Sequence, residues 1–123
     1  MLAEFREEWF TETRHFIKHK LGEKYEPNGT GFAVIKNQAQ LLRVLKVVHY
    51  FGQVGLLVDS GLLPPRLISQ CMGKAVSDCW MKLKTYINEE QKRTDGSREY
   101  AENFKLLVNL CNEDTQSAAH AAT

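Results

Sequence analysis

The sequence predicts an all-α fold, a single-domain helical bundle of four long helices plus one short helix. Apolar residues recur at helical spacing along most of the 123 residues. No stretch alternates apolar and polar side chains over a useful strand length. Glycine and proline clusters divide the chain into segments of helical length. We expect residues 1–112 to form the bundle domain and residues 113–123, which lack apolar periodicity, to form a disordered or frayed tail.

The first helix is predicted over residues 2–21, with Gly22 as its stop signal. Its apolar side chains gather on one arc, and acidic residues near its start and basic residues near its end match the helix dipole. Because Trp9 and Phe10 are adjacent, both cannot point into the centre of one core. Either this helix is covered from two directions, or one ring joins an exposed aromatic patch that marks a partner or dimer surface.

Residues 22–36 form the longest connection, a turn-rich loop. Its apolar segment, residues 32–35, is expected to pin the loop to the core or to add one helical turn. The pattern leaves open whether the loop has a function or is only mobile.

Residues 37–58 predict the central helix, opened by Asn37 and Gln40 as a capping pair. Apolar residues occupy most of its circumference, and the remaining sector holds Arg43, Lys46, Tyr50 and Gln53. A helix apolar on most sides must be surrounded by others. Gly52 and Gly55 lie in the apolar arc, where a neighbouring backbone is expected to approach closely. The longest uncharged run, residues 47–58, is shorter than the roughly 20 apolar residues of a membrane span.

Three further helices follow. Gly61 is the expected left-handed cap of the central helix. A short helix is predicted over residues 65–72 and a third long helix over residues 74–93, separated by Gly73. Ser97 is expected to cap a last helix with an apolar inner face made by Tyr100, Phe104, Leu107, Val108 and Cys111.

Composition bounds the class of protein. A hydrophobic content of 43%, a charged content of 25% and a formal net charge of +1 fit a soluble globular domain and disfavour dedicated nucleic-acid binding. Cys71, Cys79 and Cys111 have no paired spacing, so we expect neither disulfides nor zinc but buried free thiols. No apolar signal core opens the chain, which predicts a cytoplasmic location.

The first helix carries a weak metal-site pattern. Glu12, His15 and His19 lie along one border of its apolar stripe, with the Glu-x-x-His spacing of di-iron bundles. A second such helix is missing, and carboxylate and imidazole pairs on a solvated face explain the pattern without a metal. We therefore expect no metal and no cofactor.

Two candidate binding regions remain. Phe5, Trp9 and Phe10 form the candidate interaction surface on the first helix. The alternative is a small-molecule pocket between helices, lined by Phe51, Trp80, Tyr86 and Phe104. No residues form a complete catalytic constellation, since His49 as a general base would need an acid or nucleophile that the sequence cannot supply, and a core thiol such as Cys79 is inert.

Several stretches together resemble a bacterial family known only as domain of unknown function 4760. They are FTETRHFI with Arg14, LRVLKVVHYFGQVGLLVDSGLL running into Gly61, LISQCMGKAVSDCWMKLKTYI, and YAENFKLLVNLC. The resemblance covers roughly residues 10–111 and implies an α-helical domain with no assigned activity and no catalytic residues. Family members often carry an N-terminal apolar membrane helix, and the amphipathic first helix of this chain departs from that pattern.

These observations predict a non-enzymatic bacterial protein that acts by protein–protein contact, including self-association as a homodimer through the first helix.

Overall fold

The fold is described from a computed structural model, for the backbone of residues 5–93 and 99–122 and for side chains as far as Glu113, those of residues 99 and 100 excepted. The helices are α2 (Glu8–His19), α3 (Leu21–Lys24), a 3-10 helix η1 (Gly31–Val34), α4 (Gln38–Asp59), α5 (Pro65–Arg93) and α6 (Glu99–Ala122). No strand occurs in these residues, so the predicted all-α fold is confirmed.

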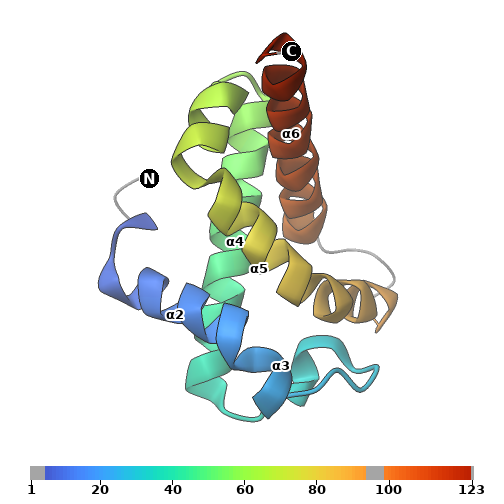
Figure 1. The fold of residues 1–123 in the computed structure, drawn as a ribbon. Helices are drawn as coiled ribbons and strands as arrows, with labels where there is room; N and C mark the ends of the chain where they lie inside the picture. Colours follow the sequence, from blue (N-terminus) through green and yellow to red (C-terminus); the bar gives the residue numbers. More distant parts are fainter. Residues whose placement is uncertain (1–4, 94–98, 123) are drawn as a thin grey trace.

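α4 and α6 form the centre of the bundle. They lie side by side along the long axis of the molecule, α5 crosses them, and α2 lies across α4 and α5 at the opposite end from the α4–α5 turn (Figure 1). α3 and the loop that carries η1 close that same end, where η1 packs on α5.

Both ends of α4 have the chemistry that the sequence predicts. The Asn37 side chain accepts a hydrogen bond from the backbone N–H of Gln40 at 3.0 Å. The Gln40 side chain does not complete the capping pair, because its Oε1 accepts from the Tyr25 hydroxyl at 2.7 Å. At the other end Gly61 has φ +79°, and the N–H groups of Gly61 and Leu62 donate to the carbonyls of Val58 and Leu57. This is a Schellman cap, which satisfies the carbonyls that the last turn of a helix leaves unpaired.

α4 is buried on most of its circumference but not on all of it. Tyr50, expected on the polar sector, is only 3% exposed. Conversely Leu42, expected on the apolar arc, is 60% exposed, and Leu56 on the same side of the helix is 50% exposed. The prediction of a helix covered on nearly all sides is therefore wrong along one stripe, since α2 and α6 pack against other faces of α4.

By length and composition alone, α4 could cross a membrane, and it is the single helix of the described residues for which this holds. Half of its apolar window is buried inside the fold, and the core helix of a soluble protein passes the same test.

The predicted close approach at a glycine of α4 is confirmed at Gly55. A Cβ added there would lie 2.2 Å from the carbonyl oxygen of Asn103 and 3.1 Å from the Cβ of Leu107, both on α6. Glycine thus brings the backbones of α4 and α6 together, which compensates for its poor helix propensity.

The predicted break at Gly73 is wrong, because α5 runs without interruption from Pro65 to Arg93. One glycine lowers helix stability by only about 1 kcal/mol. Ile68, Met72 and Val76 are buried and lie four residues apart, so the same face enters the core on both sides of Gly73.

The short helix of the fold lies elsewhere, at α3 within the predicted loop. Gly22 lies inside α3, and the first helix ends at His19 rather than at Leu21. At the other end of the chain, α6 continues past Asn112 to Ala122, so the backbone is helical where a frayed tail is expected.

The long loop is fixed at its apolar segment, where both expected features occur. η1 adds a helical turn, and Phe32 and Ile35 are buried. The side chain of Glu89 accepts from the N–H of Gly31 at 3.2 Å, and that of Glu90 accepts from the N–H of Phe32 at 3.3 Å. The loop is therefore tied to the end of α5 by two carboxylates.

Candidate functional site: the surface of α2 and α4

Trp9 and Phe10 point in different directions. Phe10 is fully buried and makes edge-to-face contacts with Tyr50 and Phe51, with ring centroids 4.9 and 5.8 Å apart. Trp9 is half-buried at the rim, and the Nζ of Lys46 lies 5.5 Å from its ring centroid. The fold therefore covers one ring and leaves the other at the edge of the exposed surface. Phe10 is a core residue, and its expected place in an exposed interaction surface is wrong.

The exposed side of α4 forms a continuous stripe, here called the α4 stripe. Its residues recur at intervals of four, three, four and three, which places them within one narrow sector of the helix. They are Leu42, Lys46, His49, Gln53 and Leu56. All five are exposed. The middle of the stripe and Trp9 border a cleft of about 340 Å³.

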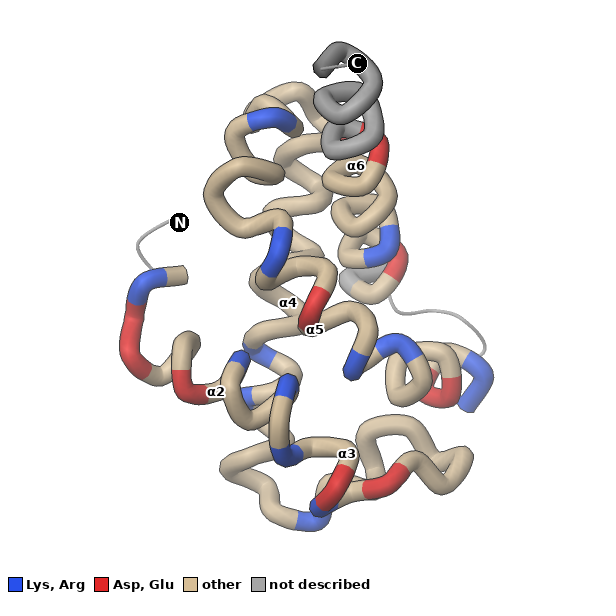
Figure 2. The backbone as a smooth tube through the Cα atoms, viewed as in Figure 1, with Lys and Arg blue, Asp and Glu red and all other residues tan. Residues whose placement is uncertain are grey.

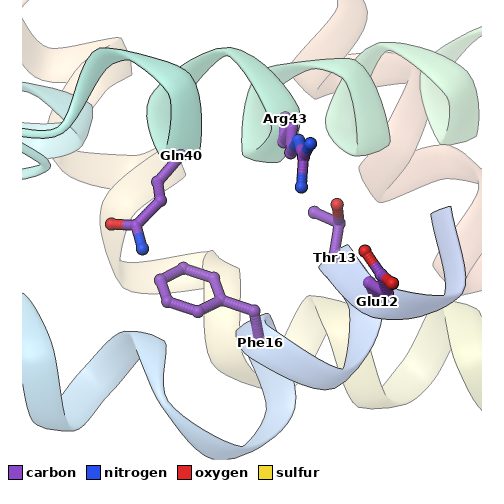
Figure 3. A pocket seen from close by; sticks show the side chains of 5 residues that line it. All are labelled: Glu12, Thr13, Phe16, Gln40 and Arg43. Atoms are coloured by element: carbon purple, nitrogen blue, oxygen red, sulfur yellow. The ribbon is translucent and has the colours of Figure 1, made fainter. Parts of the chain in front are cut away.

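A second cleft lies further along the same two helices. Its volume is about 110 Å³. Gln40 and Arg43 point from α4 toward α2, and Glu12, Thr13 and Phe16 point back from α2 (Figure 3). The hydroxyl of Thr13 donates to the carbonyl of Trp9 at 2.7 Å, so its hydrogen is already engaged within α2. Glu12 and Arg43 place opposite charges on the two walls of this cleft.

The weak metal candidates lie beside one another in two pairs. Glu12 and His15 border one open cleft, and His15 and His19 border the cleft toward α5. The two imidazole rings are neighbours, with centroids 4.6 Å apart. Across the described residues, no group of three His, Cys, Asp or Glu side chains is placed to hold a metal ion.

The candidate aromatic pocket between helices is filled by its own side chains. Phe51 and Phe104 are fully buried with ring centroids 5.2 Å apart, and Trp80 contacts Phe104 at 5.5 Å. Tyr86 lies in a different contact, stacked on Phe32 and donating its hydroxyl hydrogen to the carbonyl of Tyr25. These four rings therefore build core rather than line one cavity.

The three thiols differ in environment. Burial raises the pKa of Cys79 to about 12, because the thiolate would lose its hydration. Cys111 is also buried. Cys71 is exposed, against the expectation of three buried thiols, since uninterrupted α5 turns this position away from the core.

The cleft between α2 and α5 is the site that sequence reasoning missed. It has a volume of about 240 Å³ and is lined by Thr11, Arg14, His15, Lys18, His19, Ala75, Asp78 and Cys79. The Nζ of Lys18 lies 3.3 Å from the Oδ2 of Asp78, which joins the two helices. Arg14 and Lys18 are one helical turn apart, a visible signal, but no sequence pattern shows that Asp78 lies opposite them.

With this geometry described, comparison with known proteins adds one finding. The family model described as domain of unknown function (DUF4760) matches residues 1–111. The chain belongs to this family. No curated protein and no solved structure matches it.

The range matched by DUF4760 agrees with the packed part of the fold. It ends at Cys111, the last residue of α6 that is described as buried. It includes α2, α4 and α5 in full, and therefore every cleft described above. The DUF4760 family has no described function, so the function must be argued from the site itself.

Proposed function

We propose that this domain is a non-enzymatic interaction module that binds a second copy of itself through the α4 stripe. The observation that carries the proposal is the pair of exposed leucines at the two ends of one helix face. Single exposed apolar residues are ordinary in soluble proteins. Leu42 and Leu56, however, share one sector of α4 with the half-buried Trp9 beside it, and all three lose unfavourable hydration if a partner covers this face.

The spacing of the stripe favours a second copy as the partner. His49 lies at its centre, and Leu42 and Leu56 lie seven residues to either side. If two α4 helices pair antiparallel about a twofold axis near His49, Leu42 of one chain meets Leu56 of the partner subunit, and the reverse contact also forms. A twofold interface requires this self-complementary arrangement. The leucine pairs would lie about 21 Å apart along the helix, at 1.5 Å per residue.

A role by contact rather than catalysis agrees with the chemistry of the described side chains. Burial keeps the Cys79 thiol protonated and unreactive. The His15 and His19 pair has no third metal ligand among the described residues. The free thiols, including exposed Cys71, favour a reducing compartment such as the cytoplasm.

Sedimentation of the full chain tests the proposal. Wild-type protein is expected to form a dimer whose fraction rises with concentration. Leu42→Lys and Leu56→Glu are each expected to yield monomers, because each puts two charges against leucines at the interface. Met81→Glu is the matched control: Met81 is 61% exposed on α5, outside the stripe, and this variant is expected to dimerise like wild type.

The double variant Leu42→Lys/Leu56→Glu separates antiparallel pairing from other arrangements. Opposite charges would then meet twice across the twofold axis, so dimerisation is expected to return relative to either single variant. A wild-type chain that stays monomeric at every concentration would refute self-association. Dimers that survive both single substitutions would place the interface elsewhere.

A further inference from the structure

The cleft between α2 and α5 has an excess of positive charge. Arg14 and Lys18 contribute two permanent cations, Asp78 contributes one carboxylate, and His15 and His19 add imidazole donors. Figure 2 shows that basic positions gather toward the end of α2, beyond the acidic positions near its start. The cleft thus carries more hydrogen-bond donors and positive charge than its own acidic group can neutralise.

Arg14 is held in place by packing rather than by an acidic partner. Its guanidinium carbon lies 4.4 Å from the ring centroid of Phe5 and 5.6 Å from that of Phe10, so aromatic rings fix its orientation. Its Nε is buried and has no hydrogen-bond partner within the part of the chain that the structure describes. A buried donor without a partner is unfavourable, because it has lost its hydration and gained no hydrogen bond. Nε itself is enclosed by the fold, so only the rest of the Arg14 side chain, which lines the cleft, is placed to meet an anion there.

Lys18 is the more exposed cation of the site. Its side chain is 45% exposed and its contact with Asp78 is a surface ion pair, which contributes little to stability. Lys18 can therefore turn from Asp78 to a ligand in the cleft at little cost. The imidazoles of His15 and His19, one turn apart on α2 and tilted by 49° against each other, lie on the same wall.

We propose that this cleft binds the phosphate group of a small molecule, with Arg14 as the fixed donor and Lys18 as the closing cation. A planar guanidinium beside a flexible ammonium matches the charge and donor needs of a tetrahedral oxyanion. The volume of about 240 Å³ admits the phosphate and part of the molecule that carries it. This site is separate from the α4 stripe and does not depend on self-association.

Inorganic phosphate is the probe, titrated into the full chain at constant ionic strength with chloride as the reference, and followed by NMR of the backbone amides. We expect saturable shifts in the residues of α2 and α5 that line the cleft. Lys18→Gln is expected to weaken phosphate binding about tenfold, the effect of losing roughly 1.4 kcal/mol of charge-assisted contact. Lys84→Gln, which removes the same charge from an exposed position of α5 outside the cleft, is expected to change nothing.

The Asp78→Asn variant tests for an increase in phosphate affinity, which damage to the fold would not produce. It removes the carboxylate that repels phosphate and competes for Lys18, so affinity is expected to rise severalfold. If phosphate causes no saturable change beyond that of chloride, the proposal is wrong. Equal weakening in Lys18→Gln and Lys84→Gln would also overturn it, because it would show a general charge effect.

Discussion

The contact between α4 and α6 at Gly55 gives the sharpest test of the packing. In Gly55→Ala the new methyl would meet the Asn103 carbonyl oxygen at 2.2 Å, far inside the 3.4 Å at which ordinary contact begins. The two helices must then separate by roughly 1 Å, which opens space along their shared core. Overpacking of this kind costs about 3 kcal/mol, and alanine returns about 1 kcal/mol of helix propensity. The net expectation is a loss of about 2 kcal/mol.

Gly73→Ala is the matched control within a helix. Its new methyl would lie 3.4 Å from the Ser69 hydroxyl oxygen and 3.9 Å from the Ser69 Cβ, which is ordinary contact with a side chain that can adjust. Only the gain in helix propensity remains, so the variant is expected to be about 1 kcal/mol more stable than wild type.

Thermal and urea denaturation followed by circular dichroism measure both variants. At about 4 °C per kcal/mol for a domain of this size, Gly55→Ala is expected to melt about 8 °C lower and Gly73→Ala about 4 °C higher than wild type. Equal effects of the two substitutions, or a stabilised Gly55→Ala, would refute the close approach of α4 and α6.

Other predictions concern the loop and the thiols. Gly31→Ala is expected to lose about 3 kcal/mol in urea denaturation, because Gly31 has φ +65° and its added Cβ would lie 2.8 Å from the Cα of Glu90; a variant as stable as wild type would exclude this contact. Glu90→Gln is expected to lower the free energy of unfolding by about 2 kcal/mol and to speed proteolysis within residues 22–36. The reason is that the buried Glu90 carboxylate accepts from the Phe32 N–H and pairs with Arg93. Unchanged proteolysis would show that the loop is held by other contacts. A thiol reagent is expected to label exposed Cys71 at once, and the buried Cys79 and Cys111 only after unfolding. The Cys71→Ser variant retains only the two buried thiols, so rapid labelling of this folded variant would contradict their burial. The pKa of the Cys79 thiol rises on folding from 9.0 to about 12. Ionisation of this thiol therefore does not lower the free energy of unfolding below pH 9, and lowers it by at most about 4 kcal/mol as the pH rises toward 12. If the denaturation midpoints of wild type and Cys79→Ala fall in parallel over this pH range, that linkage is contradicted.

Local signals account for the parts of the fold that the sequence predicts. The Asn37 cap, the left-handed Gly61 and the apolar face of α5 each depend on residues within one or two helical turns. Such features survive in the fold because tertiary packing agrees with them. The close approach at Gly55 is also predictable, since a glycine inside an apolar arc loses helix stability that close packing of a neighbouring helix can offset.

The errors arise where packing decides against the local pattern. Gly73 resembles a helix stop, but burial of Met72 and Val76 on either side carries α5 through it. Tyr50 falls in a polar sector by periodicity, yet its ring packs on Phe10 of α2 and is buried. Leu42 fits the apolar arc, but no described helix covers the face that it shares with Leu56.

The same limit applies to the candidate site. The aromatic residues expected to form an interaction surface or a pocket are divided between rim and core, because helix pairing, which the sequence does not show, decides which ring is covered. The α2–α5 cleft escaped detection for the same reason, since Arg14 and Asp78 lie far apart in the sequence.

The distance between the two copies of residue 49 tests the antiparallel pairing of α4 most directly. Spin labels attached to a His49→Cys variant, in a chain whose exposed Cys71 is replaced by serine, report this distance by pulsed electron paramagnetic resonance. Pairing about a twofold axis near His49 predicts one short distance between chains, well below that for a label at Met81. Absence of coupling between chains, or a longer distance at position 49 than at position 81, would contradict it.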